Sequence, residues 1–186
     1  KYEVVEKFVS INGEGTKAGQ LAVFIRFKGC NLNCKYCDTK WANEQETPSQ
    51  PMTEKEILDY VLSTGVKNVT LTGGEPLLRE GIENVITVLA ENNLNIEIET
   101  NGSVYLDKIR KLHKENVTFT MDYKLSCSGM EAAMNVDNFN ILSSNDTVKF
   151  VAGCREDLIK AKQIIEKYNL YGKCNLYISP VFGMIE

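Results

Sequence analysis

The stretch TEKEILDYVLSTGVKNVTLTGGEP, residues 53–76, decides the fold class. Thr53 lies three residues before Glu56, and this spacing predicts a capping box at the start of an amphipathic helix. NVTLT (68–72) follows as a short apolar run that is typical of a buried strand. A helix that leads directly into a buried strand is the repeating unit of an α/β chain.

The same unit repeats along the rest of the chain. The pattern predicts helices at about 80–92, 105–114, 129–135 and 155–168, and strands at 95–100, 117–123, 147–151 and 175–179. Before the first unit, VVEKFVS (4–10) and LAVFIRFKG (21–29) are β-rich runs joined by a connection that contains several glycines. Counting from LAVFIRF, six strands are available, too few for a closed eight-stranded barrel. The sequence therefore predicts an α/β fold, a partial (β/α)6-type barrel with a mostly parallel sheet.

The composition indicates a single domain. A chain of 186 residues, with 43% hydrophobic and 25% charged residues, can bury a sizeable core, so we expect residues 1–186 to form one domain. The polar segment ANEQETPSQP (42–51) is then a loop of that domain rather than a linker between two domains.

Charge and hydropathy argue against several kinds of partner. The net charge of −4 and the pI near 5.2 argue against direct binding of nucleic acid, because a phosphate backbone needs a basic surface. No stretch approaches the roughly 20 apolar residues of a membrane span, and the start KYEVVEKFVS lacks the basic-then-apolar order of a signal peptide. We therefore expect a cytoplasmic protein without membrane contact.

Segments rich in glycine, cysteine and polar residues directly follow the predicted parallel strands. GCNLNCKYCDTKW (29–41) follows the first barrel strand, and TGGEP (72–76), TNGS (100–103) and DYKLSCSG (122–129) follow the next three. Functional loops of such folds leave the carboxyl ends of the strands, because those ends meet on one rim of the sheet. These four segments are therefore predicted to form one site.

Three cysteines in the first of these loops indicate a metal centre. Cys30, Cys34 and Cys37 lie within eight positions, and a tight thiol cluster in a reducing compartment points to metal rather than to disulfides. Thiolates of this kind hold iron–sulfur clusters, normally with four ligands per cubane, so one iron would be left open. Structural zinc would need a fourth ligand, for which Asp38, the single histidine His113 or a distant cysteine is available. Spacing alone leaves both metals open.

The other three cysteines are scattered along the chain. We expect Cys127, Cys154 and Cys174 to be small buried hydrophobic residues without a chemical role. His113, if it is not a ligand, is expected on a solvated helix face.

With the aromatic Tyr36 directly before the last cysteine, the loop resembles the signature of the radical S-adenosylmethionine family. The resemblance implies a 4Fe–4S cluster on the three cysteines, with S-adenosylmethionine on the open iron and the cluster loop after the first barrel strand. Gly73-Gly74-Glu75-Pro76 resembles a second family motif, which binds the methionyl amino group; bare glycine backbone permits such a close approach. The residues implied for cofactor binding are Tyr36, Asp38, Thr72, Gly73, Gly74, Glu75, Thr100, Asn101, Lys124 and Ser126.

SINGEG (10–15), FIRF (24–27) and Cys37-Asp38-Thr39 narrow the resemblance to the 7-carboxy-7-deazaguanine synthase family. This resemblance implies conversion of 6-carboxy-5,6,7,8-tetrahydropterin to 7-carboxy-7-deazaguanine, a ring contraction with loss of ammonia in queuosine and deazapurine biosynthesis. It also implies Mg²⁺ on Thr39, a homodimer, and a flavodoxin-like or ferredoxin-like electron donor. No side chain is predicted to be catalytic by itself, because the cosubstrate supplies the radical.

The implied substrate is a pterin that carries a carboxylate, and such a ring needs a cation and hydrogen-bond acceptors. Arg26, near the carboxyl end of its strand, offers a bidentate fork for the carboxylate. Glu14, between two glycines, offers an acceptor where the backbone can approach closely. The predicted substrate-binding residues are Ile11, Asn12, Gly13, Glu14, Gly15 and Arg26.

Two other functions stay open from the sequence. A glycyl-radical-enzyme activase shares the three-cysteine loop, and a zinc-stabilised module without catalysis would use the same thiols. The resemblance also implies that the chain usually continues beyond SPVFG (179–183), so substrate contacts from a terminal helix after Glu186 are not assigned.

Overall fold

The computed structural model describes residues 1–112 and 115–184. Its centre is one eight-stranded sheet with the strand order β3-β1-β2-β4-β5-β6-β7-β8. The strands are β1 (Tyr2–Ile11), β2 (Leu21–Phe27), β3 (Gln50–Met52), β4 (Asn68–Gly73), β5 (Asn95–Thr100), β6 (Val117–Tyr123), β7 (Thr147–Ala152) and β8 (Asn175–Pro180). The α-helices are α1 (Glu54–Thr64), α2 (Ile82–Glu91), α3 (Asp107–Leu112) and α4 (Arg155–Lys167).

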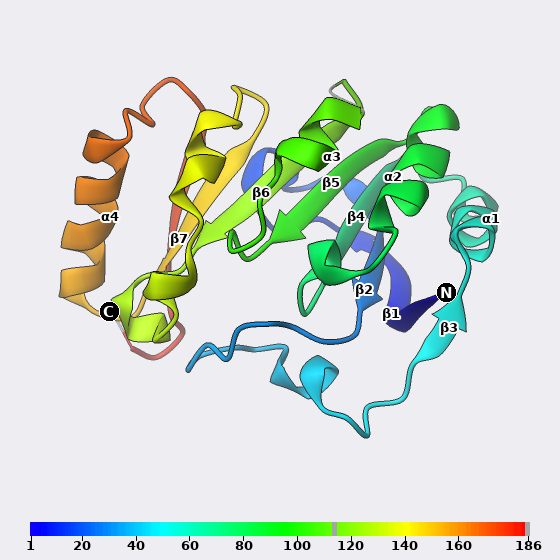
Figure 1. Cartoon of the computed structure of the whole chain (residues 1–186), viewed down its shortest axis with the longest axis horizontal. Coiled ribbons are helices and arrows are strands. Elements are labelled where there is room, and N and C mark those ends of the chain that lie inside the picture. Colours follow the sequence, from blue (N-terminus) through cyan, green and yellow to red (C-terminus); the bar gives the residue numbers. More distant parts are fainter. Residues whose placement is uncertain (113–114, 185–186) are drawn as a thin grey trace.

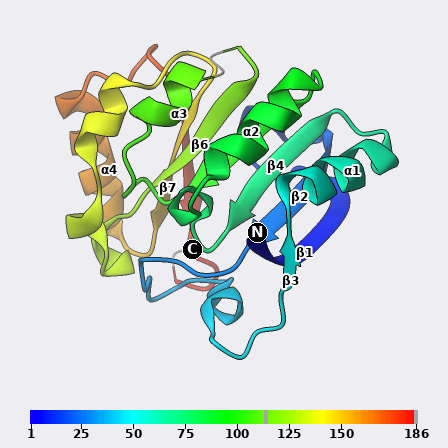
Figure 2. The ribbon, with the colours of Figure 1, turned by 45° about the vertical axis from the view of Figure 1, so that its right-hand side comes forward.

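Six neighbouring strands pair in parallel: β2, β4, β5, β6, β7 and β8. Strand β1 is antiparallel to both of its neighbours, β2 and β3. The sheet is curved but open, with β3 at one edge and β8 at the other (Figures 1 and 2). These six strands are the six that the sequence predicts, so the partial barrel is confirmed.

The two faces of the sheet differ in polarity because side chains alternate along each strand. The four α-helices cover one face (Figures 1 and 2). Strand residues that point to this face are at most 1% exposed: Ile25, Leu71, Ile98, Phe119 and Phe150. Their chain neighbours point to the other face and line a cavity: Arg26, Thr72, Glu99, Thr120 and Lys149. The helices therefore bury an apolar core on one side and leave a polar inner face on the other.

The first βα unit has the local structure that its sequence predicts. The backbone N–H of Glu56 donates to the Thr53 hydroxyl, and the backbone N–H of Thr53 donates to the Glu56 carboxylate, which completes the capping box. Helix α1 ends at Gly65, which adopts the left-handed conformation that terminates helices.

Two predictions about the connections need correction. The loop predicted at 42–51 includes the turn η2 (Lys40–Asn43) and ends in β3, where Pro51 is tolerated because β3 is an edge strand. The helix predicted near 129–135 is a single 3₁₀ turn, η5 (Glu131–Ala133). It stops there because the Asn135 side chain accepts from the backbone N–H of Asp137 and starts a new turn. His113 lies outside the described residues.

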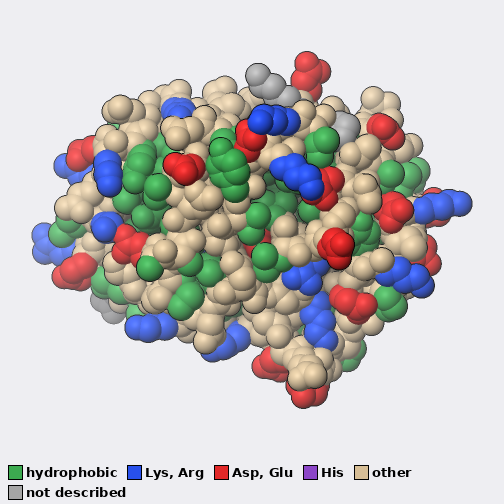
Figure 3. Space-filling view, in the orientation of Figure 1, with side chains coloured by type: hydrophobic (Ala, Val, Ile, Leu, Met, Phe, Trp, Pro, Cys, Tyr) green, Lys and Arg blue, Asp and Glu red, His purple; other side chains and the backbone are tan. Residues whose placement is uncertain are grey.

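The surface in Figure 3 carries positive and negative side chains interspersed over the helix-covered face. Among the described residues, no helix is long and apolar enough to cross a membrane.

Candidate active site

The inner face of the sheet, at the carboxyl ends of the parallel strands, borders a cavity of about 810 Å³. The loop that follows β2 runs along this rim, at the bottom of the view in Figure 1. Every barrel strand supplies lining residues either along its length or just past its end. One cavity therefore unites the segments that the sequence predicts to form one site.

The three clustered cysteines line this cavity from a single loop. Cys34 is buried, and burial raises the pKa of its thiol, whereas Cys30 and Cys37 are half-buried. The Cys30 sulfur accepts from the backbone N–H of Leu32 and from the Asn101 side chain, both at 3.4 Å. Among the described residues, no fourth thiol lines the cavity, so these donors suit a cluster with one open position better than a closed zinc site.

The glycine pair that follows β4 fixes the start of the cysteine loop. The backbone N–H of Gly74 donates to the Phe27 carbonyl at 3.1 Å, and that of Glu75 donates to the Gly29 carbonyl at 2.9 Å. A Cβ on Gly74 would lie 2.1 Å from the Gly29 oxygen, and one on Gly73 would lie 2.3 Å from the Phe27 oxygen. Only glycine fits both positions, and their first role is contact with the neighbouring backbone.

Glu75 does not line the cavity, although it was predicted to bind the cofactor. Its side chain is fully buried, and burial raises the pKa of its carboxyl group to about 7. The carboxylate accepts from the backbone N–H groups of Asn101 at 2.6 Å and Leu77 at 3.0 Å, and from the Thr100 hydroxyl at 3.0 Å. Glu75 is therefore a positioning residue that ties the glycine segment to the end of β5.

The ends of β5 and β6 supply further predicted residues. Thr100, Asn101 and Lys124 line the cavity. Burial alone would lower the pKa of Lys124, but the Asp122 carboxylate, 2.6 Å away, raises it, so the ammonium stays charged. Ser126 is exposed, is not among the residues that line the cavity and donates to Glu131 at 2.6 Å, so its contact with the cofactor stays a prediction.

The residues after the second and third thiols also face the cavity. The Tyr36 hydroxyl donates to the Val151 carbonyl at 3.1 Å, which fixes the ring against β7. The Thr39 hydroxyl donates to the Asp38 carboxylate at 2.7 Å. Asp38 and Thr39 together present oxygen atoms, the ligand type that Mg²⁺ prefers.

The opposite end of the cavity holds most of the residues predicted for the substrate. Asn12, Gly13, Glu14 and Arg26 line it. The Lys149 ammonium donates to the Glu14 carboxylate at 2.5 Å.

Arg26 lines the cavity and also forms an ion pair with the partly exposed carboxylate of Glu6. Its Nε donates to Glu6 at 2.9 Å. Among the described residues, its terminal nitrogens have no hydrogen-bond partner, which leaves a charged donor pair toward the cavity.

Two residues predicted to bind substrate lie elsewhere. Ile11 is 64% exposed at the end of β1, because the side-chain alternation points it away from the sheet interior. Gly15 is not among the residues that line the cavity, and an added Cβ would lie 3.5 Å from the Thr120 and Thr147 hydroxyls.

The cavity lining also includes polar residues to which the sequence analysis gave no individual binding role, among them Asn43, Glu99, Asp122 and Lys149. Glu99 and Lys149 stand inside short apolar strands, and a charge at such a position is the signal that could have found them. The side-chain oxygen of Asn43 and one carboxylate oxygen of Asp122 are buried without a hydrogen-bond partner among the described residues. Both are therefore available to accept from a bound ligand.

Glu99 is the cavity group whose protonation is tuned to neutral pH. Burial, together with the nearby carboxylates of Glu97 and Glu14, outweighs the Thr72 hydrogen bond and raises the pKa of its carboxyl group to about 7. Among the described residues, the Thr72 hydroxyl, 2.6 Å away, donates to it.

This combination of an open α/β barrel and a three-thiol loop defines the class of protein. The model of the radical SAM superfamily matches residues 24–124, which include the cysteine loop and the glycine pair, so the chain belongs to this superfamily. Within it, the chain belongs to the 7-carboxy-7-deazaguanine synthase family.

The relatives behind this assignment match nearly the full chain. A 7-carboxy-7-deazaguanine synthase from Clostridium acetobutylicum is 60% identical over 186 residues, which covers 100% of this chain and 84% of the relative. One from Chlorobaculum tepidum is 34% identical over 98% of this chain and 81% of its own. The crystal structure of QueE from Escherichia coli has a TM-score of 0.75 and 22% identity over 97% of this chain and 84% of that chain.

The family assignment fixes the class of chemistry. The chain is a radical S-adenosylmethionine lyase, and its cofactors are those expected from the sequence: a 4Fe–4S cluster, S-adenosylmethionine and Mg²⁺. The comparisons give no support to an activase or to a zinc module.

We expect Gly74→Ala to disrupt the contact between the glycine pair and the cysteine loop. Because the new methyl group would overlap the Gly29 carbonyl, the free energy of unfolding should fall by about 1–3 kcal/mol in urea titrations. Gly13→Ala is the matched control, since nothing lies within 4 Å of its added Cβ. Equal stability of the two variants would contradict the proposed crowding.

We expect Glu99→Gln to remove part of the pH dependence of stability. The folded pKa near 7 lies above the usual value of 4.5, so the folded state holds a proton that the unfolded state has released. Wild-type stability should therefore fall as pH rises from about 5 to about 8, and the variant should gain about 2–3 kcal/mol relative to wild type over that range. Glu91→Gln, at an exposed carboxylate, is the control; unfolding curves of Glu99→Gln that parallel wild type at every pH would refute the assignment.

Proposed function

We propose that this protein converts 6-carboxy-5,6,7,8-tetrahydropterin to 7-carboxy-7-deazaguanine, with ring contraction and loss of ammonia, in deazapurine and queuosine biosynthesis. The observation that carries the proposal is one cavity that has the thiol loop at one end and Glu14, Arg26 and Lys149 at the other. The 60% identity to a relative of that name over the whole chain supports the same reaction.

The thiol end of the cavity is suited to the cluster and its cosubstrate. Cys30, Cys34 and Cys37 would hold the 4Fe–4S cluster. When bound, the cluster and S-adenosylmethionine supply a carbon radical that removes a hydrogen atom from the substrate. The unpartnered Asn43 oxygen offers an acceptor for an ammonium beside Gly74, and Lys124 offers a charged donor for a carboxylate.

The other end is suited to a carboxylated pterin. Arg26 would bind the substrate carboxylate through its terminal nitrogens. Glu14, held by Lys149, would accept from the amino and amide edge of the ring. Glu99 has a pKa near 7, so it can hold a proton and release it to the departing ammonia nitrogen.

Mg²⁺ would be held at Thr39. A hydroxyl and a carboxylate at adjacent positions provide hard oxygen atoms on the cavity wall, beside the thiol loop. The ion would bring the substrate carboxylate to a fixed position relative to the cosubstrate.

The remaining parts of the proposal concern assembly and partners. Residues 1–186 form one domain, since a single sheet takes strands from Tyr2 to Pro180. A homodimer is supported by exposed apolar residues Tyr177 and Ile178 on the edge strand β8. An acidic flavodoxin-like or ferredoxin-like donor suits the exposed Lys35 and Lys40 of the thiol loop, and the cytoplasm provides such donors.

The first test is an anaerobic assay of the reconstituted, reduced protein with S-adenosylmethionine, Mg²⁺ and the pterin substrate. We expect 7-carboxy-7-deazaguanine by mass spectrometry, and we expect Arg26→Gln to raise KM at least tenfold. Formation of 5′-deoxyadenosine without the deazaguanine product would keep the radical chemistry and reject this substrate.

We expect Thr39→Ala to weaken the dependence of the rate on Mg²⁺, because one oxygen ligand is lost. The concentration of Mg²⁺ that gives half the maximal rate should rise by about tenfold, while the iron content per chain stays that of the wild type. Thr39→Ser keeps the hydroxyl and is the matched control. A magnesium titration of Thr39→Ala that overlays the serine variant would mean that the hydroxyl only caps the turn.

A further inference from the structure

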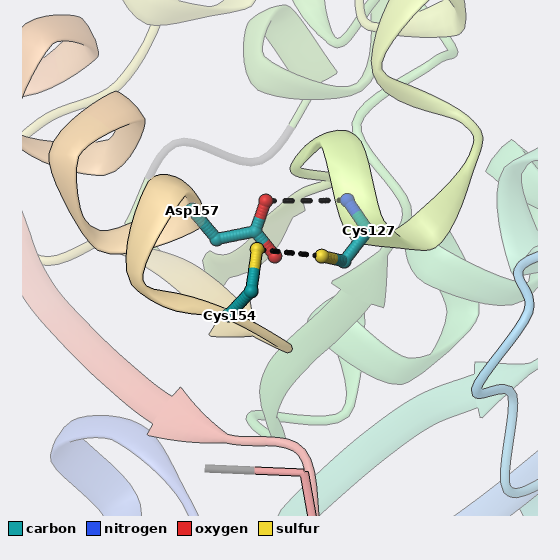
Figure 4. A group of neighbouring side chains, drawn as sticks. All are labelled: Cys127, Cys154 and Asp157. Carbon is teal, nitrogen blue, oxygen red and sulfur yellow. Dashed lines mark hydrogen bonds between the residues drawn. The ribbon is translucent and has the colours of Figure 1, made fainter.

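Two further cysteines, Cys127 and Cys154, are in contact outside the cavity. Cys127 lies in the turn η4 (Ser126–Ser128), and Cys154 directly precedes α4. Their sulfur atoms point toward each other, 2.8 Å apart, although the residues are 27 positions apart in the chain (Figure 4). Both are half-buried, so only Cys174 fits the expectation of a buried hydrophobic residue.

Asp157 holds the backbone on both sides of this pair. Its side chain is fully buried at the first turn of α4. One carboxylate oxygen accepts from the backbone N–H of Cys127 at 3.2 Å (Figure 4). The other accepts from the backbone N–H of Gly153 at 2.9 Å. Gly153 also packs closely, since an added Cβ would lie 2.9 Å from the Cys127 Cβ. The meeting of the two sulfurs is therefore fixed by the backbone.

The geometry favours a dithiol over a metal site. Two thiolates on a tetrahedral zinc ion, each at about 2.3 Å, would lie about 3.8 Å apart, well beyond the observed separation. The Asp157 oxygens, which would have to complete the site, already accept from backbone N–H groups.

The two thiols are also in different electrostatic positions. Their mutual hydrogen bond raises the pKa of Cys127 to about 12, so Cys127 keeps its proton. Cys154 directly precedes the 13-residue helix α4, and its side chain makes no hydrogen bond to the helix N-terminus, so its described hydrogen-bond contact is the one with Cys127. Because Cys127 keeps its proton, Cys154 is the nucleophile of the pair.

We propose that Cys127 and Cys154 are a reversible redox pair that forms a disulfide by exchange with a small-molecule disulfide. The Cys154 thiolate attacks one sulfur of the small disulfide, whose S–S bond breaks and releases one thiolate, which takes up a proton from water. Cys127 then loses its proton to water and attacks the Cys154 sulfur, which forms the intramolecular bond and releases the second small thiol. Two electrons pass from the pair to the small disulfide.

The pair lies beneath the loop that carries the three clustered cysteines. The backbone N–H of Lys35 donates to the Ser128 carbonyl at 3.0 Å, so that loop rests on η4. A disulfide would tie η4 to the start of α4 and restrain this support. The inference does not depend on the substrate of the enzyme.

The test uses the reconstituted holoprotein, incubated anaerobically in glutathione buffers of increasing oxidised-to-reduced ratio. Free thiols are then alkylated, and the digested protein is analysed by mass spectrometry. We expect a peptide that links Cys127 to Cys154 and disappears with dithiothreitol, while the visible absorbance of the cluster stays constant. The oxidised protein should melt at least roughly 3 °C higher, because the bond closes a long loop.

Serine variants identify the order of events. Cys127→Ser should stop at a mixed disulfide of Cys154 with glutathione, and Cys154→Ser should form the corresponding adduct at least about tenfold more slowly. Cys174→Ser is the control and should keep the linked peptide. The proposal is overturned if no linked peptide forms at the most oxidising ratio, or if the protein retains one zinc ion per chain that Cys127→Ser loses.

Discussion

The close approach of two backbones at the carboxyl ends of β2 and β4 is the constraint on which the active site depends. Gly73 and Gly74 bring the end of β4 against Phe27 and Gly29, and this contact fixes where the thiol loop begins. The Glu75 carboxylate then fixes this segment to the end of β5 by accepting hydrogen bonds from Thr100 and Asn101. It also accepts from the backbone N–H of Leu77. Three neighbouring strand ends are thereby held together.

The open barrel also allows charged groups to lie inside a small domain. The inner face is never closed by an eighth parallel strand, so the cavity it borders is large enough for both a cosubstrate and a ring-sized substrate. Several of the charges that face it are paired: Glu14 with Lys149, and Asp122 with Lys124. Pairing offsets the cost of removing these groups from water, and the unpaired oxygens that remain mark where ligands are expected.

Much of this architecture follows from the sequence because periodicity and strand-end motifs report on local structure. The six parallel strands, the capping box at Thr53 and the thiol loop behind β2 were all accessible in this way. The direction of side chains within a loop could not be predicted from the sequence. Glu75 and Ser126 both belong to motif segments, but Glu75 is buried and Ser126 is exposed. The raised pKa of Glu99 was also not accessible, because it depends on burial by segments that are distant in the chain.

The strict alternation of the strands has an evolutionary consequence. Ile98 packs under the helices while the adjacent Glu99 faces the cavity, and Phe150 and Lys149 divide in the same way. Inserting or deleting one codon inside β5 or β7 would exchange these partners, placing a carboxylate or an ammonium in the apolar layer. We therefore expect the strands to tolerate substitutions better than insertions or deletions, and length changes to be tolerated in the connections.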